Sequence, residues 1–338
     1  MSHQVRIEPA GRILTVEDSE TILDAALRSG VALPYSCRGG SCGTCKSKLL
    51  AGRVDYGQYE DRAMSAAERE AGSVLICQAK PLSDVVIEAR VLEQAADIPI
   101  RILPCRVVGL ERAAPDVMVV SLKLPEHERF QYLAGQYIDI LLRDSARRSF
   151  SLAHAPGRDE LLELHIRQVP GGLFTTHVFE KLKERDLLRF QGPYGSFFLR
   201  EGSSPVILVA GGTGFAPMQA IIEQVLAAQP DRPLHLYWGA RARPDLYRHE
   251  LAERWAEQHP DFRYTPVLSE PDPADAWSGR TGFVHQAVLA DYPDLSGCEV
   301  YASGPPVMVE SIRHEFLAHG LPPDRLYSDS FEFSHDRR

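Results

Sequence analysis

Hydrophobic and polar residues alternate along the first part of the chain in a way that predicts a small mixed α+β domain. Apolar side chains recur at every second position around Val5 and Ile7 and again around Ile13. The predicted elements are a hairpin over residues 3–18, a capped helix over 19–27, a short helix opened by the capping-box pattern of residues 65–68, and a closing strand over 84–89. This arrangement favours a compact α+β domain over residues 1–92.

The middle of the chain carries short β-rich segments separated by turn residues. Residues 93–99 have weak periodicity and are expected to form a linker. The predicted strands cover residues 105–110, 117–124, 137–142, 148–153 and 161–167. Their regular spacing is typical of an antiparallel barrel or sandwich, and we expect a β-barrel domain over residues 100–202.

The pattern changes again near residue 204, where short apolar runs alternate with helical stretches. The runs cover residues 206–210, 234–238 and 300–302. Such alternation is typical of an α/β domain built on a parallel sheet, and we expect this domain over residues 203–338. The sequence therefore predicts three domains of different fold class.

Composition narrows the functional classes only slightly. The chain has 338 residues, and its net charge of −9 argues against nucleic acid as a partner. Its first residues do not resemble a secretion signal, and no apolar run approaches the ~18 residues that a membrane span requires. We expect a cytoplasmic monomer with no membrane contact.

Four cysteines carry the strongest chemical signal. Cys37, Cys42 and Cys45 share one glycine-rich loop with the spacing C-x4-C-x2-C, and Cys77 follows at a distance. This is the spacing of plant-type [2Fe–2S] ferredoxins, in which four thiolates hold two irons. Glycines let such a loop wrap the inorganic core and bring backbone N–H groups toward the sulfides. The four cysteines are therefore the expected metal ligands.

A zinc site or a disulfide framework fits these cysteines less well. Structural zinc sites usually present two short C-x2-4-C hooks, and only one is found in the sequence. A disulfide framework suits a short secreted chain rather than one of this length. The remaining two cysteines, Cys105 and Cys298, stand alone in apolar segments and are expected to be buried small hydrophobic residues.

The segment Arg148-Ser149-Phe150-Ser151 has the residue types that a flavin would require. An arginine can pair with a pyrophosphate, an aromatic ring can stack on a flavin, and a serine hydroxyl can donate to a ring nitrogen. In a strand, Arg148 and Phe150 project to one face while Ser149 and Ser151 project to the other. Taken alone, this pattern is more often that of a half-buried strand.

A second segment strengthens the flavin interpretation. Gly171 and Gly172 are followed by Thr175 at the start of an apparent helix, where a threonine cap and free N–H groups would favour an anion. Together with the preceding strand, this site suits the pyrophosphate of a flavin dinucleotide.

A third segment joins a strand to a helix through a glycine turn. In residues 209–217, Gly212, Thr213 and Gly214 precede Pro217, which is expected at the first position of the helix, and the turn amides would face a pyrophosphate. The pattern departs from the G-x-G-x-x-G fingerprint, and Arg241 stands where dehydrogenases carry an acidic residue after the next strand. An ordinary dehydrogenase fold is therefore not expected.

These motifs together resemble the iron–sulfur flavoprotein reductases of the ferredoxin–NADP reductase superfamily that carry an N-terminal ferredoxin domain. The resemblance covers essentially the whole chain and extends to reductases of CDP-6-deoxy-hexulose dehydratases and of oxygenases. Its motifs are residues 135–137, 148–151, 172–175, 192–195, 211–217 and 303–308.

The resemblance implies a β-grasp fold for the first domain. It also implies a [2Fe–2S] cluster, FAD and NADH as cofactors, and it assigns residues to each nucleotide. For FAD and the nicotinamide nucleotide these are Arg148, Ser149, Phe150, Ser151, His165, Ile166, Arg167, Gly171, Gly172, Thr175, Gly212, Thr213, Gly214, Pro217, Arg241, Gly304, Pro305 and Met308. Catalytic roles fall to Ser151, Ser303 and Phe331. Phe331 would cover the flavin face that nicotinamide must reach, and a core aromatic residue is an equally good interpretation.

Two positions differ from the family pattern. Ser303 stands where many relatives have a cysteine beside the nicotinamide, which implies slower hydride transfer at a retained site. Phe150 stands where many have tyrosine, so stacking is kept and the phenol hydrogen bond is lost.

The expected function is transfer of hydride from NADH to FAD and of single electrons through the cluster to a partner protein. That partner would be a CDP-sugar dehydratase, a Rieske or diiron oxygenase, or a cytochrome P450 that docks near the cluster loop around Arg38 and Ser41. NADPH is the alternative donor, because Arg241 and Arg243 could meet a 2′-phosphate unless Asp245 and the acidic residues of 269–272 pair with them. Reduction of a small molecule at FAD, without a protein acceptor, and a redox sensor are the competing functions.

Overall fold

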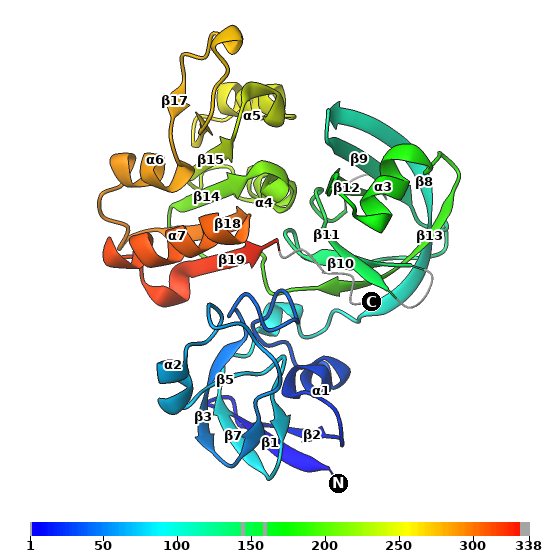
Figure 1. The fold of residues 1–338 in the computed structure, drawn as a ribbon, viewed down its shortest axis with the longest axis vertical. Helices are drawn as coiled ribbons and strands as arrows, with labels where there is room; N and C mark the ends of the chain where they lie inside the picture. The colour runs from blue at the N-terminus through cyan, green and yellow to red at the C-terminus, as the bar shows by residue number, and fades with distance from the viewer. Residues whose placement is uncertain (1, 143–145, 158–160, 332–338) are drawn as a thin grey trace. The chain divides into compact units, whose positions relative to one another are not determined.

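The computed structural model describes residues 2–142, 146–157 and 161–331 and divides the chain into two compact units (Figure 1). The first unit consists of Met1–Pro99 together with Tyr194–Phe197, and the second consists of Ile100–Pro193 and Phe198–Arg338. Residues 332–338 of the predicted third domain lie outside the described part of the chain.

The first unit is built on a mixed five-stranded sheet, as expected of a β-grasp fold. Its strand order is β2-β1-β7-β3-β5, with β1 parallel to β7 and the other pairs antiparallel. The strands are β1 (His3–Glu8), β2 (Arg12–Val16), β3 (Lys46–Ala51), β5 (Ser73–Leu75) and β7 (Val85–Glu88), and β4 (Val54–Asp55) pairs with β6 (Lys80–Pro81). Val5 and Ile7 are buried, as the alternation predicts, but the predicted phase of the second strand is wrong: Ile13 is 61% exposed, and Leu14 and Val16 are buried instead.

The two helices of this unit begin at capping boxes. Helix α2 (Ala66–Glu70) is capped by Ser65 and Glu68, as predicted. Helix α1 (Ile22–Arg28) starts later than expected, because Thr21 rather than Ser19 is the N-cap and exchanges hydrogen bonds with Asp24. Ser19 has a φ of 76°, which lies outside the helical region.

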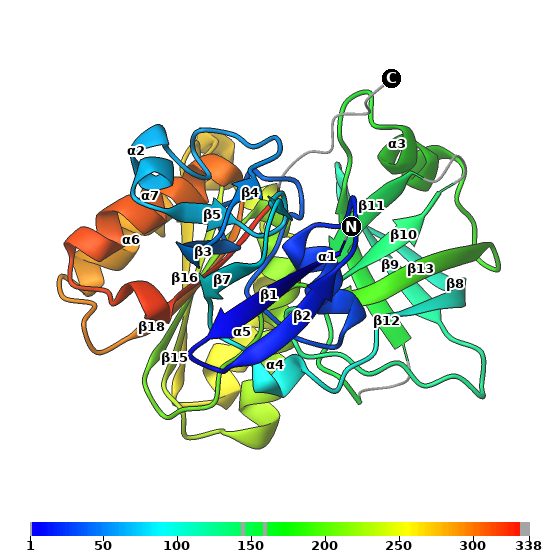
Figure 2. The ribbon, with the colours of Figure 1, turned by 90° about the horizontal axis from the view of Figure 1, so that it is seen from below.

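Six antiparallel strands form the β-barrel of the second unit, in the order β11-β10-β13-β8-β9-β12 (Figure 2). They are β8 (Arg101–Ala114), β9 (Val117–Lys123), β10 (Tyr137–Leu141), β11 (Arg147–Ser151), β12 (Leu161–Arg167) and β13 (Leu187–Tyr194), with α3 (Leu173–Glu180). A bridge between Leu152 and Leu164 joins the two end strands. The predicted barrel is confirmed, and β13 is a strand that the sequence patterns did not reveal.

The remainder of the second unit is an α/β domain with an all-parallel sheet, as predicted. The strand order is β17-β16-β15-β14-β18-β19. The strands are β14 (Val206–Gly211), β15 (Leu234–Ala240), β16 (Phe262–Leu268), β17 (Arg280–Thr281), β18 (Glu299–Gly304) and β19 (Leu326–Ser330). The helices are α4 (Phe215–Ala228), α5 (His249–Gln258), α6 (Val284–Asp291) and α7 (Pro306–Ala318).

Helices cover both faces of this sheet because its central strands are apolar on both sides. Val209 and Tyr237 pack with residues of α6 and α7, while Trp238 stacks on Phe215 of α4 with 4.0 Å between ring centroids. Cys298 is 8% exposed here and Cys105 is 2% exposed in the barrel, so both are buried, as expected.

The strand order reverses between β14 and β18. From β14 the chain moves outward through β15, β16 and β17, and it then returns to the other side of β14. At such a switch point, the loops at the carboxyl ends of the two central strands diverge and leave a crevice for a ligand. The loops at this place carry residues 211–214 and 304–305.

Candidate cofactor and electron-transfer site

The four predicted cluster ligands come together in two pairs. Three of them lie on the loop between α1 and β3, Cys77 follows β5, and all four are free thiols. The thiol of Cys42 hydrogen-bonds to Cys37, and that of Cys45 to Cys77. The bond from Cys42 lowers the pKa of Cys37 to about 4, and the same contact raises the pKa of Cys42.

This donor set fits a two-iron cluster better than a single ion. Across the described ranges, no three His, Cys, Asp or Glu side chains are arranged to hold one metal ion. Two separate thiol pairs are what two irons require, because each iron takes two protein thiolates and two bridging sulfides. The residues therefore fit a [2Fe–2S] cluster.

The backbone of the cluster loop is held close to the neighbouring chain. A Cβ at Gly40, where φ is 78°, would lie 2.7 Å from the carbonyl oxygen of Gln58, so only glycine fits. The N–H of Gly39 donates to Cys37 Sγ over 3.4 Å. Donors of this kind stabilise thiolates. Arg38 of the same loop lies over the ring of Tyr194, 4.0 Å from its centroid.

The predicted flavin motif lies on β11 in the barrel. Phe150 is half-buried and packs against the barrel core and Phe174, 5.6 Å between ring centroids. Ser149 donates to Asp139 over 2.7 Å, and Arg148 Nη1 donates to the carbonyl of Arg147. Ser151 is buried at the end of this strand.

The N-terminus of α3 offers free donors beside this motif. Gly172 is the N-cap and has no side-chain cap, and a φ of 74° at Gly171 turns the chain into the helix. The prediction that Thr175 caps the helix is wrong: Thr175 lies inside the first turn, and its hydroxyl accepts from the N–H of Val169. These uncapped N–H groups fit a pyrophosphate such as that of FAD.

The nicotinamide motif is a close contact between two glycine-containing loops at the switch point. A Cβ at Gly214 would lie 2.0 Å from the carbonyl oxygen of Ser303, and one at Gly304 would lie 2.9 Å from that of Gly211. Helix α4 has Gly214 as N-cap without a side-chain cap, which leaves donors for a phosphate. Pro217 is the third residue of α4 rather than the first, because the turn 212–214 is itself a short 3-10 helix.

Neighbouring residues of this motif have structural partners. The indole N–H of Trp238 donates to the carbonyl of Gly212 over 3.0 Å, and Thr213 is buried. A Cβ at Gly211 would lie 2.7 Å from Met308 Sδ and 2.8 Å from Pro305 Cδ, so these two side chains pack on the glycine backbone. Met308 and Pro305 therefore shape the loop that a nucleotide would approach.

The three predicted catalytic residues are linked to the carboxyl ends of β18 and β19, where Ser151 contacts the carboxylate of Asp329. Ser303 pairs with Asp329 across β18 and β19, and the N–H of Phe331 donates to the carbonyl of Gly304. Ser151 Oγ donates to Asp329 Oδ2 over 3.2 Å. The buried Ser303 Oγ has no hydrogen-bond partner among the residues that the structure describes, which fits a polar ligand. Phe331 is half-buried.

Asp329 is the residue that sequence reasoning missed. It is only 6% exposed, in a strand whose sequence, Leu326-Tyr-Ser-Asp-Ser330, has no hydrophobic pattern. An acid two residues before Phe331 is the only signal that the sequence offered, and its meaning depends on a contact with Ser151 that no local pattern reveals.

Two side chains of the predicted cofactor segment 165–167 are engaged within the protein. Ile166 points into the barrel core, and both ring nitrogens of His165 are occupied, by Glu163 at 2.9 Å and by the hydroxyl of Tyr247 at 2.8 Å. Arg167 Nε lies 3.3 Å from Asp116 Oδ2, and its guanidinium packs against the backbone of Gly212. The segment stays a predicted cofactor contact.

Arg241 is exposed at the end of β15, with Asp245 4.0 Å away. The N–H of Glu270 donates to the carbonyl of Arg241, and Asp275 accepts from the N–H of Arg243. Asp245 therefore lies within ion-pair distance of Arg241, and the carboxylate of Asp275 binds the backbone of Arg243. Pairing with acids is the alternative to a role at a 2′-phosphate.

Comparison with protein families identifies the class. The family model of the 2Fe-2S iron-sulfur cluster binding domain matches residues 5–82, that of the oxidoreductase FAD-binding domain matches 104–199, and that of the oxidoreductase NAD-binding domain matches 208–314. The chain is thus a flavin- and nicotinamide-dependent oxidoreductase that carries an iron–sulfur domain.

Similar proteins place it within this class. It is 41% identical to the CDP-6-deoxy-L-threo-D-glycero-4-hexulose-3-dehydrase reductase of Yersinia pseudotuberculosis, over 98% of this chain and 99% of that protein. It is 42% identical to the phenol hydroxylase P5 protein of Acinetobacter pittii, over 98% and 95%. The crystal structure of the Amycolatopsis cytochrome P450 reductase GcoB matches with a TM-score of 0.80 and 38% identity, over 97% of this chain and 98% of that one. The chain belongs to the family of three-domain iron–sulfur flavoprotein reductases.

It follows that this chain is an NADH-dependent oxidoreductase with a [2Fe–2S] cluster and FAD, and that it passes electrons to a partner protein. Within the described residues, no helix has the length and apolar character needed to cross a membrane.

Proposed function

We propose that the terminal acceptor is a CDP-sugar dehydratase or an oxygenase component, and that electrons leave through the cluster held by Cys37, Cys42, Cys45 and Cys77. The observation that carries this proposal is the placement of four paired thiols in a unit that contains neither the flavin motif nor the nicotinamide motif. When bound, FAD supplies the conversion of a two-electron hydride into single electrons, which a [2Fe–2S] cluster requires.

The residues around Asp329 would orient the two nucleotides. Asp329 accepts the single hydroxyl proton of Ser151 from the α/β domain, so Ser151 would present a lone pair, rather than a proton, to the flavin ring. The unpaired Ser303 Oγ would bind the nicotinamide amide, and Phe331 would occupy the face that the nicotinamide must reach. Positioning of this kind lowers the barrier by fixing the approach of the reacting atoms.

The remaining nucleotide contacts are assigned by position. Arg148 and the N-terminus of α3, with Gly171 and Gly172, would hold the FAD pyrophosphate. The turn 212–214 at the start of α4 would hold the pyrophosphate of NADH.

A cysteine substitution separates electron exit from flavin reduction. We expect Cys42→Ser to abolish NADH-driven cytochrome c reduction, because it removes a cluster ligand, while NADH-driven ferricyanide reduction survives at the flavin. The matched control is Cys298→Ser, which changes a buried thiol outside the cluster. Parallel loss of both activities in the Cys42 variant would contradict the relay.

The acceptor is identified by direct reduction. Purified candidate dehydratase and oxygenase components are mixed anaerobically with NADH and catalytic amounts of the reductase, and the spectrum of the acceptor is followed. Reduction of one candidate that disappears with the Cys42→Ser variant supports the proposal. Rapid reduction of free flavin or another small molecule, with no protein acceptor reduced, would favour the alternative function.

We also propose that the chain divides by function into a cluster domain over residues 1–92, a linker over 93–99, an FAD-binding barrel over 100–202 and a nicotinamide-binding domain over 203–338. A 3-10 turn, Glu93–Ala95, occupies part of the proposed linker. Cysteines that serve as cluster ligands must stay reduced until the cluster is assembled, which supports a cytoplasmic location. We expect a monomer, which sedimentation at working concentrations tests.

A further inference from the structure

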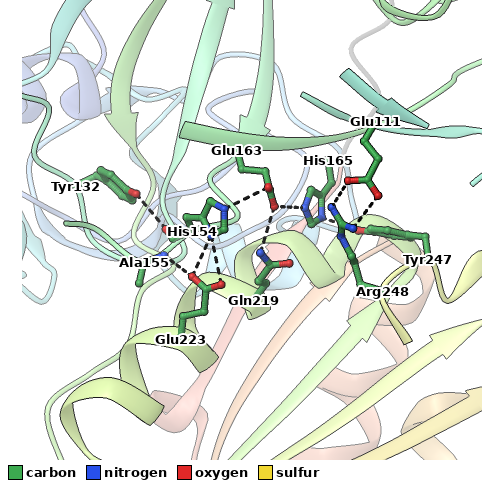
Figure 3. Close-up of polar contacts among 10 residues, drawn as sticks. All are labelled: Glu111, Tyr132, His154, Ala155, Glu163, His165, Gln219, Glu223, Tyr247 and Arg248. Carbon is green, nitrogen blue, oxygen red and sulfur yellow. Dashed lines mark hydrogen bonds and ion pairs between the residues drawn. The ribbon is translucent and has the colours of Figure 1, made fainter. Parts of the chain in front are cut away.

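A buried polar cluster links the barrel to helix α4 (Figure 3). His154 lies three positions after Ser151 on the barrel side, and its ring reaches two carboxylates. Its Nε2 is 3.2 Å from Glu163 of β12, and its Nδ1 is 3.1 Å from Glu223 of α4. Glu223 also accepts from the N–H of Ala155 over 3.1 Å. One imidazole thus bridges the strand that follows the flavin motif and the helix that follows the nicotinamide motif.

The geometry fixes the charge of this ring. An ionised carboxylate only accepts hydrogen bonds, so an imidazole that faces carboxylates with both nitrogens must carry a proton on each. His165 provides the contrast: it donates to Glu163 through one nitrogen and accepts from the Tyr247 hydroxyl through the other, which is the pattern of a neutral ring. Of these two histidines, His154 is the cation.

The pKa values agree with this assignment. Burial alone would lower the pKa of His154, but its hydrogen bonds to Glu163 and Glu223 outweigh burial and raise it to about 9. Burial lowers the pKa of His165. The titratable and charged groups around His154 are Glu163 and His165 on β12, Glu223 on α4, Tyr132 before β10, and Arg248 before α5, next to His165.

We propose that His154, as an imidazolium, is a positioning residue for hydride transfer, because it locks α4 onto the barrel and so sets how the nicotinamide motif approaches the flavin strand. The side chains are well shielded: 24% of His154, 12% of Glu163 and 7% of Glu223 are exposed. The exposed fraction matters because solvent would otherwise screen the bridge. The N-terminus of the helix that Glu223 anchors is Gly214, which contacts Ser303.

Loss of the proton reverses the interaction. Above the pKa of His154, one ring nitrogen presents a lone pair to a carboxylate, and the carboxylates of Glu163 and Glu223 no longer share a cation between them. The bridge is therefore present below about pH 9 and lost as the pH rises through that value. This inference rests on the proposed roles of Ser151 and Gly214.

The test follows flavin reduction by NADH in the anaerobic holoenzyme, together with the long-wavelength charge-transfer absorbance between nicotinamide and flavin. In the wild type, both should fall as the pH rises through about 9. We expect His154→Gln to lower the limiting rate about tenfold or more at pH 7, weaken the charge-transfer absorbance, and remove the alkaline decline. Glu223→Gln should move the alkaline decline of rate and absorbance to lower pH, because it removes one of the two carboxylates that raise the pKa of His154. If His154→Gln fails to retain its flavin, the Glu223 variant provides the test.

The matched control is Glu111→Gln. Glu111 forms a two-point ion pair with Arg248, at 2.8 and 2.7 Å, which also joins the barrel to the α/β domain, but it is 56% exposed and lies away from α4. This variant should keep the wild-type rate, absorbance and pH profile. Equal effects of the Glu111 and His154 variants, or an unchanged profile in both His154→Gln and Glu223→Gln, would overturn the proposal. Electron exit through the cluster does not enter this measurement, so a failure of the proposed acceptor leaves it unaffected.

Discussion

The tightest contact in the nicotinamide motif predicts a large effect from a single methyl group. In Gly214→Ala, the new Cβ would lie 2.0 Å from the carbonyl oxygen of Ser303 and 2.5 Å from its carbonyl carbon, both backbone atoms that cannot rotate away. Ordinary van der Waals contact begins near 3.4 Å, so the two loops must separate by roughly 1.4 Å. A displacement of about 1 Å in a positioned site can cost about 100-fold in rate.

We therefore expect kcat/KM for NADH-driven ferricyanide reduction to fall about 100-fold in Gly214→Ala. The flavin and cluster absorbance should stay, because both cofactors bind elsewhere, and overpacking should cost about 1–3 kcal/mol of stability. Gly297→Ala is the control, since nothing lies within 4 Å of a Cβ at that position in the same domain. A Gly214 variant within about threefold of wild type would refute the tight contact between the two loops.

Asp329, His235 and the two exposed arginines each lead to a measurable consequence. Asp329→Asn should slow flavin reduction by NADH about tenfold with little change in KM, because the Ser151 hydroxyl loses a charged acceptor; an unchanged rate would contradict this role. Burial lowers the pKa of His235 to about 4, so between pH 6.5 and pH 4 the unfolded chain binds a proton at this residue and the folded chain does not. The free energy of unfolding, measured with urea, should therefore fall by about 3 kcal/mol over this range, and His235→Gln should reduce that fall. NADH should exceed NADPH in kcat/KM, because Asp245 lies 4.0 Å from Arg241 and Asp275 binds the N–H of Arg243, so both positions carry a carboxylate that would repel a 2′-phosphate; a clear NADPH preference would refute this.

Features set by local sequence were predictable, and features set by distant contacts were not. The cysteine spacing and the glycine motifs are local, so they located the cluster loop and the nucleotide turns directly. The bond between Ser151 and Asp329 joins residues 178 positions apart, and the two histidines differ in charge only because of which side chains the fold brings to them. The hydrophobic pattern did not predict strand β19, because its buried residues are polar and are buried through the pairing of this strand with β18.

Small shifts in the expected elements have similar causes. Thr175 looked like a helix cap by residue type, yet Gly172 takes that position because the chain turns into the helix earlier. Pro217 falls at the third position of α4 because a 3-10 turn absorbs the preceding glycines. Residue preference identified the correct regions, and backbone geometry decided the exact roles.

In the proposed relay, electrons from NADH reach the cluster only through the flavin. The most direct measurement is anaerobic stopped-flow mixing of the holoenzyme with NADH, followed at flavin and cluster wavelengths, and repeated on protein from which FAD has been removed. We expect flavin absorbance to bleach first and cluster reduction to follow, and we expect the cluster of the flavin-free protein to stay oxidised. Reduction of the cluster by NADH at the same rate without FAD would show that the flavin is not the obligatory carrier.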